Sequence, residues 1–474
     1  MVSALKWVNV SIQDIVNNDY RLEAACYNIE SIKANDILGH LSIPLKPLFG
    51  SNGIAEVYNL PRFKRVFVEK SDLPIFQPSQ ITDVYPKPQL YISAKTKTNI
   101  DALRVSKDQL LMTCSGTIGK CAIVWDRLNN SIFSHDLLRI NSKNEFDTAF
   151  IYAYIRTDIG QTLLSAKPYG AVIQHIEPEH LINYLIPYPA EKTRRDIGYK
   201  IIQSFEKRDL SNDMIDKAEN LLITYLNLPP IEGIEHLQYD PSVAVNNFSI
   251  DISKWQNRLE AKYHNPTIQM ILDILIKSNS EIVPLGNNYL STNILLPGRF
   301  QRVYVERDQG TVFLGGKQIY ELDPYNKKYL SIKKHGERID NDLLIQENMI
   351  AVTRSGTIGR VNLIPKYMVN WIYSEHVIRV VPSTNDIAGY LYIWLNSDYG
   401  RAMIERYSYG AVIKEIDNKQ LAQMPIPVIH DKNKIKQIND LALEANNLRT
   451  EAYYLEQEAI EDVNKLMGLD IMEE

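Results

Sequence analysis

The chain has 474 residues, of which 45% are hydrophobic and 23% are charged, and its formal net charge is −5. This composition is typical of a globular protein and excludes a disordered, collagenous or purely coiled-coil chain, while the length predicts about two to four folded units. No run of about 18 apolar residues is present, so no membrane-spanning helix is expected.

The cysteines and the first residues indicate the cellular compartment. Three cysteines, Cys26, Cys114 and Cys121, are too few for a disulfide framework and lack the spacing of metal ligands. Residues 1–20 do not resemble a secretory signal. We therefore expect a cytoplasmic protein, in a reducing environment, with no metal site.

The first element with a clear pattern is a β-hairpin in residues 110–125. The apolar run Leu110–Thr113 leads into Ser115-Gly116, and Cys121–Trp125 follows as the return strand. The segment between them is not a Walker A loop, which requires a glycine where Cys114 stands. We interpret it as a hairpin turn whose glycines allow positive φ, and a second interpretation has its amides and Lys120 contact a phosphate backbone.

Helical patterns follow the hairpin. Residues 148–165 predict an amphipathic helix, and Tyr169–Ile173 a loop that presents an aromatic ring or packs it at a helix exit. Residues 193–227 carry apolar side chains at intervals of three and four, which predicts a long helix that Pro229-Pro230 ends. Residues 231–254 are proline- and glycine-containing and predict a linker.

The chain then repeats itself. Ser115–Lys120 recurs as Ser355–Arg360, and Tyr169–Ile173 recurs as Tyr409–Ile413, both at an offset of 240 residues. Further matches preserve their order, with the offset drifting to 237 upstream, where Arg62-Phe63 and Arg65 return as Arg299-Phe300 and Arg302. The chain is therefore two copies of one unit, and the second copy predicts a helix over 387–407 and a long helix over 433–467.

The two long helices each need a partner for their apolar stripe. The nearest partner is the duplicate, and antiparallel pairing as a coiled coil would place two similar heads at opposite ends of a rod, related by a pseudo-two-fold axis. A helix of this length spans about 50 Å, or about 15 base pairs of duplex DNA as an upper bound on the separation of the heads. The expected fold class is mixed α/β (α+β).

The predicted domains follow from these elements. They are a first globular domain, a long helix, a linker, a second globular domain and a second long helix, at residues 1–189, 190–230, 231–254, 255–430 and 431–474.

No catalytic set is evident. His135 aligns with Glu375, and Asp136 aligns with His376, so the copies do not share a nucleophile–histidine–acid set. Neither a methyl-donor motif nor a nuclease-like carboxylate–lysine cluster is present. The chain is expected to be non-catalytic.

Basic and aromatic groups are the candidate DNA contacts, because cations suit phosphates while polar side chains read base edges. Each can equally be a solvated surface residue. The candidates are Arg62, Lys64, Arg65, Lys95, Lys97, Lys120, Tyr169, Gln174, Arg299, Arg302, Lys317, Lys327, Lys328, Lys333, Lys334, Arg360, Tyr409 and Lys414.

Taken together, the chain resembles the specificity subunit of type I restriction–modification enzymes. The resemblance rests on Ser115–Lys120 and Ser355–Arg360, the helix and Tyr-Gly loop of each copy, the exits Ile186–Pro189 and Ile426-Pro427, and the helix that follows each exit. The family usually opens that helix with Glu-Gln, whereas Ala190-Glu191 and Val428-Ile429 follow the exits here.

The resemblance implies a subunit without chemistry of its own that reads a bipartite duplex, one half per recognition domain. It would dock two modification subunits that carry S-adenosylmethionine and the adenine methyltransferase site, and restriction subunits would join for cleavage. No cofactor is expected in this chain. An alternative is a duplicated protein-binding scaffold in another DNA-modification or phage-defence complex, favoured by the acidic segments 190–240 and 431–474, which together carry 12 basic and 21 acidic residues.

Overall fold

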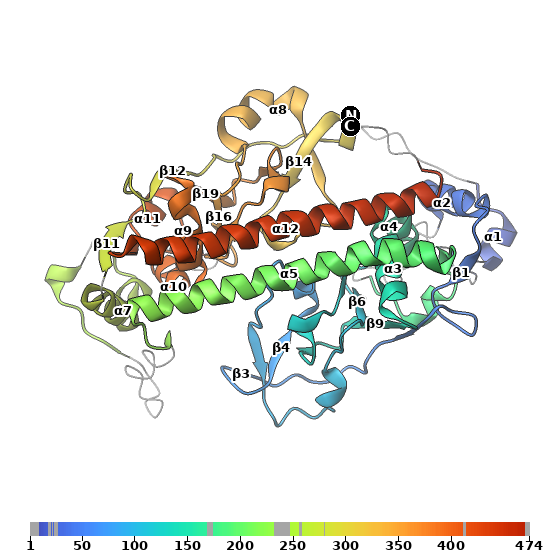
Figure 1. Ribbon diagram of the computed structural model, residues 1–474, viewed down its shortest axis with the longest axis horizontal. Coiled ribbons are helices and arrows are strands. Elements are labelled where there is room, and N and C mark those ends of the chain that lie inside the picture. The colour runs from blue at the N-terminus through green and yellow to red at the C-terminus, as the bar shows by residue number, and fades with distance from the viewer. Residues whose placement is uncertain are drawn as a thin grey trace. The chain divides into compact units, whose positions relative to one another are not determined.

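The computed structural model describes residues 9–17, 20, 22, 27–167, 174–231, 247–255, 258–278, 280–410 and 414–469. The chain divides into a first unit, Met1–Asp209 with Glu451–Glu474, and a second unit, Leu210–Thr450 (Figure 1). Both divisions fall inside a long helix, so each long helix contributes residues to both units. Most of the predicted linker lies outside the described residues.

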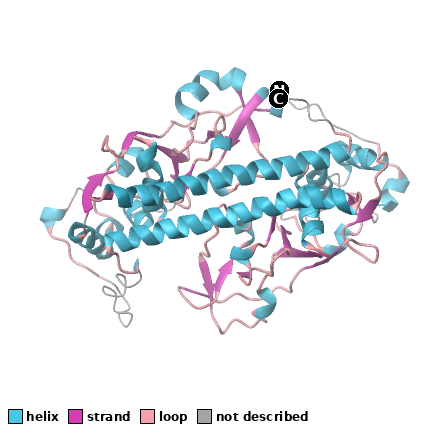
Figure 2. Cartoon of the chain, viewed as in Figure 1, coloured by secondary structure: helices cyan, strands magenta, loops and turns pink. Residues whose placement is uncertain are grey.

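The first unit contains a buried antiparallel sheet. Its strands occur in the order β2 (Ala55–Tyr58), β9 (Leu137–Ser142), β6 (Leu110–Thr113) and β7 (Cys121–Ile123). Figure 2 draws the strands of the chain in magenta. All four residues of β6 are buried, because side chains cover both of its faces. The predicted hairpin is confirmed, since Leu110 pairs with Ile123 and Met112 pairs with Cys121.

A second sheet of the first unit has its own small core. Its strands occur in the order β3 (Phe67–Val68), β5 (Leu90–Ile92), β4 (Pro74–Phe76) and β8 (Ile132–Phe133), and β8 runs parallel to β4. Ile75, Ile92, Leu103 and Ile132 form a buried cluster on it. Two further strands, β1 (Leu45–Pro47) and β10 (Leu185–Pro187), pair with each other.

The predicted single helix over 148–165 is two helices. The helices of the first unit are α1 (Ile12–Asn17), α2 (Ile29–Gly39), α3 (Glu145–Arg156), α4 (Asp158–Ser165) and α5 (Glu191–Leu226). The break comes at Thr157, whose hydroxyl donates to Tyr154 O and accepts from Gly160 N. A Cβ at residue 160 would lie 2.2 Å from Tyr154 O, so the bend requires glycine.

The second unit repeats this architecture. Its sheets have the orders β12 (Ser291–Leu295), β19 (Val377–Pro382), β16 (Ile350–Thr353), β17 (Val361–Leu363), and β13 (Tyr304–Val305), β15 (Lys328–Ser331), β14 (Gly310–Leu314), β18 (Ile372–Tyr373). The remaining pair is β11 (Ser280–Pro284) with β20 (Pro425–Ile429). Strand order and direction match the first unit throughout, so the duplication seen in the sequence is a duplication of fold.

The helices of the second unit show one clear difference. They are α7 (Pro266–Lys277), α8 (Ile332–Arg338), α9 (Asn385–Asn396), α10 (Asp398–Arg406), α11 (Asn418–Ala422) and α12 (Lys432–Leu466). Ser397 breaks α9 from α10 as Thr157 does in the first unit, so the single helix expected over 387–407 is also wrong. Helix α8 follows β15 directly, whereas a turn follows the equivalent strand β5.

The long helices pair antiparallel within each unit, as the sequence predicts. In the first unit, Lys200 Nζ lies 2.8 Å from Asp462 Oδ2, and Lys207 Nζ lies 2.5 Å from Glu451 Oε2. In the second unit, Ser211 Oγ donates to Ala445 O at 2.9 Å, and Tyr225 donates to Gln437 at 2.6 Å. As the residue number along α5 rises, the number of its partner in α12 falls, so the two helices run antiparallel.

The seam is not a simple apolar stripe, as residues 455 and 456 show. Leu455 belongs to the predicted stripe, yet the structure leaves it half-buried and buries Glu456 beside it, at 1% exposure. Glu456 accepts from the Tyr152 hydroxyl at 2.8 Å and forms ion pairs with Arg156, at 3.0 Å, and with Arg208. The buried carboxylate of Glu456 therefore holds helix α12 against α3 and α5 of the first unit.

Among the described residues, none of the helices has both the length and the apolar character needed to cross a membrane.

A buried arginine joins the two sheets in each unit. Arg139 of β9 donates to the carbonyls of Ala102, Leu103 and Arg104 at 2.8–2.9 Å. Arg379 of β19, the equivalent residue, donates to the carbonyls of Leu343, Tyr373 and Val377. Burial lowers the pKa of Arg379 to about 10. Carbonyl dipoles thus compensate a buried cation and hold the segment beside the second sheet.

Replacing Glu456 is expected to destabilise the first unit. Glu456→Ala leaves two buried guanidinium groups without their carboxylate, which should lower the free energy of unfolding by about 3–5 kcal/mol. Glu458→Ala, two residues away and 57% exposed, removes only a surface pair with Lys200 and should cost less than about 1 kcal/mol. Urea unfolding of the full chain measures both, and equal losses would contradict the assignment.

The arginine that joins the sheets can be tested in the same way. Arg139→Met leaves three carbonyls without their donors and should lower the free energy of unfolding by roughly 2–4 kcal/mol. The control Lys143→Met changes an exposed cation near the end of the same strand and should stay within about 0.5 kcal/mol of the parent. A loss for Arg139→Met no larger than the control's would show that this link contributes nothing to stability.

Candidate nucleic-acid interface

The Ser-Gly-Thr-Ile-Gly segments are hairpin turns with one shared construction. Thr113 Oγ1 donates to Thr117 O at 2.5 Å, and Thr353 Oγ1 donates to Thr357 O at 2.6 Å. Both glycines of each turn have positive φ, between 73° and 85°. The turn interpretation is confirmed, and Gly116 and Gly356 stand in open space at the surface.

A short segment lies against each turn. In the first unit, Gly116 N donates to Gln174 O at 3.1 Å, and Ile176 N donates to Cys114 O at 3.0 Å. In the second unit, Ile416 N donates to Arg354 O at 3.0 Å, and Ser355 bridges Glu415. Gln174 and Lys414 therefore occupy equivalent exposed positions beside the two turns.

In the second unit, Glu415 gathers two arginines beside the turn. Arg354 Nη2 lies 2.9 Å from Glu415 Oε2, and Arg299 Nη2 lies 3.4 Å from Glu415 Oε1. Arg299 is largely exposed, so its guanidinium still has N–H groups to offer a ligand. The first unit has Cys114 and His175 at the equivalent positions, and burial followed by the Asp136 carboxylate raises the pKa of the Cys114 thiol to about 11.

A second ion pair lies at the end of strands β8 and β18. In the second unit, Arg302 Nη2 is 2.6 Å from Glu375 Oε1, and Ser355 Oγ is 2.9 Å from His376 Nδ1. In the first unit, Arg65 Nη2 is 2.9 Å from Asp136 Oδ2. The structure thus brings Arg65 and Arg302, two predicted contacts, to equivalent places in the two units.

The predicted contacts divide by exposure. Eleven are exposed: Arg62, Lys64, Lys95, Lys97, Gln174, Arg299, Lys317, Lys328, Lys333, Lys334 and Lys414. Six are half-buried: Arg65, Lys120, Arg302, Lys327, Arg360 and Tyr409. Tyr169 lies outside the described residues.

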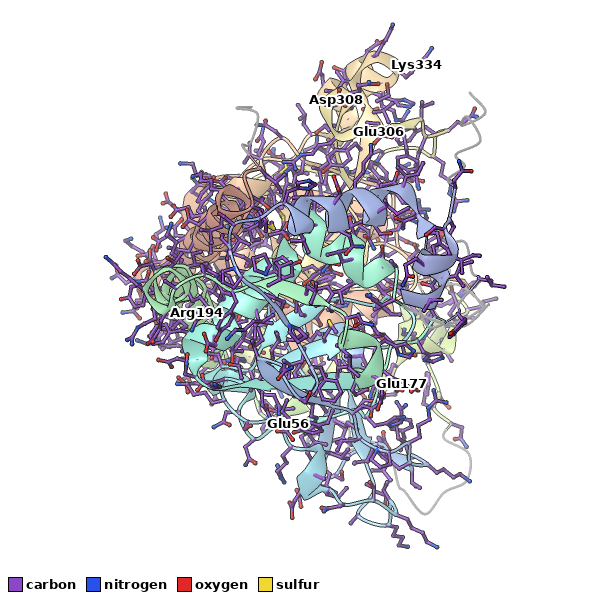
Figure 3. The ribbon with its side chains drawn as sticks, turned by 90° about the vertical axis from the view of Figure 1, so that its right-hand side faces the viewer. Glu56, Glu177, Arg194, Glu306, Asp308 and Lys334 are labelled. Atoms are coloured by element: carbon purple, nitrogen blue, oxygen red, sulfur yellow. The ribbon has the colours of Figure 1, made fainter. Side chains whose placement is uncertain are left out.

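Several of these side chains already contact other groups. Arg360 stacks on the Tyr320 ring, with 3.8 Å from its guanidinium carbon to the ring centroid. Lys327 pairs with Asp323, and Lys328 stands 5.1 Å from the Tyr304 ring centroid. Lys334 projects from α8 in the same part of the second unit as Glu306 and Asp308 (Figure 3). Helix α8 therefore adds a basic surface next to acidic residues, and the first unit has no helix at that place among its described residues.

Sequence reasoning missed the acids that pair with the arginines and the histidine that lies beside one of these acids. Asp136, Glu375, His376 and Glu415 were not among the predicted contacts, although the alignment of His135-Asp136 with Glu375-His376 was visible. The signal that could have found them is an acid at one of two successive positions in each copy. Among the described residues, no group of three or more histidines, cysteines or acids is arranged to hold a metal ion.

Comparison with known families now adds to this geometry. Residues 305–440 match the family model described as "Type I restriction modification DNA specificity domain". This segment is therefore a DNA specificity domain of the type I restriction–modification family, and the resemblance found in the sequence is confirmed. The first unit shares the strand order of the second. A comparison with curated proteins finds no match.

Solved structures give distant likenesses along most of the chain. A type I restriction–modification S subunit from M. genitalium is 11% identical, with a TM-score of 0.35, covering 91% of this chain and 98% of that one. The HsdS subunit from Thermoanaerobacter tengcongensis is 13% identical, with a TM-score of 0.26, covering 91% and 96%. A structure described as explaining complex assembly of the type I R-M system is 14% identical, with a TM-score of 0.28, covering 87% and 97%.

The stability of the first unit should depend on the protonation of His135. Burial lowers the pKa of His135, although the Asp136 carboxylate opposes this. Near pH 6.5, the unfolded chain therefore binds a proton at His135 that the folded chain does not bind. Its contribution to stability is complete above about pH 6.5 and is lost as the pH falls through and below that value. Relative to His135→Gln, the parent should lose stability between about pH 6.5 and 5.

Urea unfolding at a series of pH values measures this difference. The control His40→Gln replaces an exposed histidine and should keep the pH dependence of the parent. Parallel curves for the parent and His135→Gln would show that His135 is not responsible.

Proposed function

We propose that this chain is a non-catalytic DNA-sequence specificity subunit that reads a bipartite duplex target, one half-site per unit. The match of residues 305–440 to a DNA specificity domain carries this proposal. The repeat of the same two sheets in the first unit supports a second reader of the same type.

The contrast between frame and loops supports two different half-sites. The strand orders, the turn hydrogen bonds and the buried arginine are the same in both units. The polar groups beside the turns differ, with Arg354 and Glu415 in one unit and Cys114 and His175 in the other. A shared frame with different hydrogen-bonding groups suits reading two unlike sequences by base-edge contacts.

The exposed cations have a separate role in this proposal. Arg62, Lys64, Lys95 and Lys97 in the first unit are exposed and suit phosphate contacts, as do Lys333 and Lys334 in the second. Such contacts supply affinity and register without reading sequence. The net charge of −5 does not oppose this, because the acidic residues are concentrated in the long-helix and linker segments.

We further propose that the long helices dock two methyltransferase subunits, which would carry S-adenosylmethionine and modify adenine, and that restriction subunits join that assembly. Exposed tyrosines on the helices of the first unit, Tyr199 and Tyr454, support a docking role, since tyrosine is enriched at protein interfaces.

Exchange of residues 1–189 with those of a related subunit tests the modular reading. We expect the hybrid, with its methyltransferase partner, to methylate sites in which one half is new and the other half is the parental one. Genome-wide mapping of methylated adenines measures this. Change in both halves, or in neither, would contradict one half-site per unit.

Salt dependence separates this proposal from a protein-binding scaffold. Phosphate contacts release counterions, so the affinity for duplex DNA should fall steeply and linearly in a plot of log affinity against log salt. The assay uses the full chain with and without its partner. A scaffold that binds only protein would show no such slope under either condition.

A further inference from the structure

The second and third residues after the end of β8, and the same two after the end of β18, lie beside backbone hydrogen bonds that both units share. Ser134 N donates to Phe76 O at 3.0 Å, and Ser374 N donates to Leu314 O at 2.9 Å. The backbone N–H of Asp136 donates to the Ser134 hydroxyl at 3.5 Å. In the same way, the backbone N–H of His376 donates to the Ser374 hydroxyl at 3.4 Å. Residues 135 and 375 are therefore equivalent inner positions, and 136 and 376 are equivalent outer positions.

The two units place an acid and a histidine at these positions in opposite order. The inner position is His135 in the first unit, 7% exposed, and Glu375 in the second, 3% exposed. The outer position is Asp136, with a side chain 25% exposed, and His376, with a side chain 39% exposed. The same frame thus presents a carboxylate at the surface of one unit and an imidazole at the surface of the other.

The arginine keeps a carboxylate partner in spite of this exchange. Arg65 pairs with the outer acid of its unit, and Arg302 pairs with the inner acid of its unit. The side chains of the Arg65–Asp136 pair are 25% exposed, whereas Glu375 in the second pair is 5% exposed. Both units thus keep a guanidinium–carboxylate pair at this place through different residues. A carboxylate that fixes a guanidinium fork leaves its other N–H groups oriented for a ligand.

The inner residues show that the exchange has a cost. His135 Nδ1 and Glu375 Oε2 are buried and have no hydrogen-bond partner among the described residues. A buried carboxylate oxygen without a donor is unfavourable. The second unit has this unfavourable carboxylate oxygen, and it also has the exposed His376, which hydrogen-bonds Ser355 beside the hairpin turn.

We propose that residues 136 and 376 are the positions that make the two units select different bases. The proposal rests on the DNA-reading function proposed above and names residues for it. Asp136 can only accept hydrogen bonds, so it selects a base with a major-groove amino group, cytosine or adenine. His376 can donate from Nε2 when Nδ1 accepts from the Ser355 hydroxyl, and it then selects a base with a major-groove acceptor, which is guanine, thymine or, through N7, adenine. Arg65 and Arg302 are positioned beside them by their carboxylates to donate to a neighbouring base or phosphate.

The test selects bound duplexes from a random pool with the full chain and its methyltransferase partner. At one position of one half-site, Asp136→His is expected to remove any preference for cytosine, which has no major-groove acceptor, and to favour guanine or thymine by about tenfold or more. His376→Asp should make the reverse change in the other half-site. Asp136→Asn keeps an acceptor and adds donors, so it should favour adenine, which asparagine reads with two hydrogen bonds.

Matched controls separate specificity from folding. Asp101→His makes the same chemical change at an exposed position of the first unit and should leave the selected sequence unaltered. Thermal unfolding of each variant checks that the unit carrying the substitution is intact. Uniformly weaker binding with the parental base preference would overturn the proposal and leave the DNA-reading function standing. If the parent complex selects no sequence at all, the proposed function and this inference both fail.

Discussion

The Glu456 carboxylate is the constraint on which the first unit depends. It lies in a buried site between Tyr152 of α3, Arg208 of α5 and Arg156, and burial raises the pKa of the Tyr152 hydroxyl well above its ordinary value. Ala459 and Val463 from the same helix, together with Met467 directly after its end, complete the core of this unit. The first unit is therefore discontinuous in sequence and cannot bury its core until the end of the chain has been made and folded onto it.

The same helix is held in the second unit by neutral groups. Asn439 accepts from Gly389 N at 2.8 Å, and Asn446 donates to Ile364 O at 3.0 Å. Gly389 permits this close approach, because a Cβ there would lie 2.4 Å from Asn439 O. Side-chain amides near the start of α12 hydrogen-bond to backbone groups, and a carboxylate nearer its end pairs with arginines. Because the two ends are held by different groups, they are not interchangeable.

The duplication, the hairpins and the long helices could be predicted from sequence because they depend on periodicity and turn residues. The long helices start and end within two residues of the predicted bounds. The break at Thr157 could not, because it depends on one hydroxyl that satisfies both a carbonyl and an amide, and the apolar spacing continues through it. The burial of Glu456 in place of Leu455 could not be predicted for a related reason. The apolar spacing indicates a buried leucine, and it contains no information about the two arginines that other helices bring to Glu456.

The ion-pair partners in the candidate site could not be predicted from sequence patterns. Basic residues were found by type, but a cation's role depends on its partner, and Arg65, Arg302 and Arg354 each have a carboxylate partner that is distant in sequence. Single-residue spacing cannot reveal pairs that are separated by 61–73 residues. The order of an acid and a histidine at two successive positions carries information only after the strands show that the backbone around them is the same.

The division between frame and polar groups has a physical basis. The frame depends on buried elements that tolerate little change: Ser134 and Ser374, Arg139 and Arg379, and the glycines that bend α3 into α4 and α9 into α10. Side chains on the rim of this frame contribute little to stability when they are part-exposed, so they are free to differ between the units. Because the backbone hydrogen bonds at residues 134 and 374 do not involve the side chains of the next two residues, an acid and a histidine can exchange places without moving the strands. A duplicated chain can in this way acquire two different surfaces while it keeps one set of packing rules.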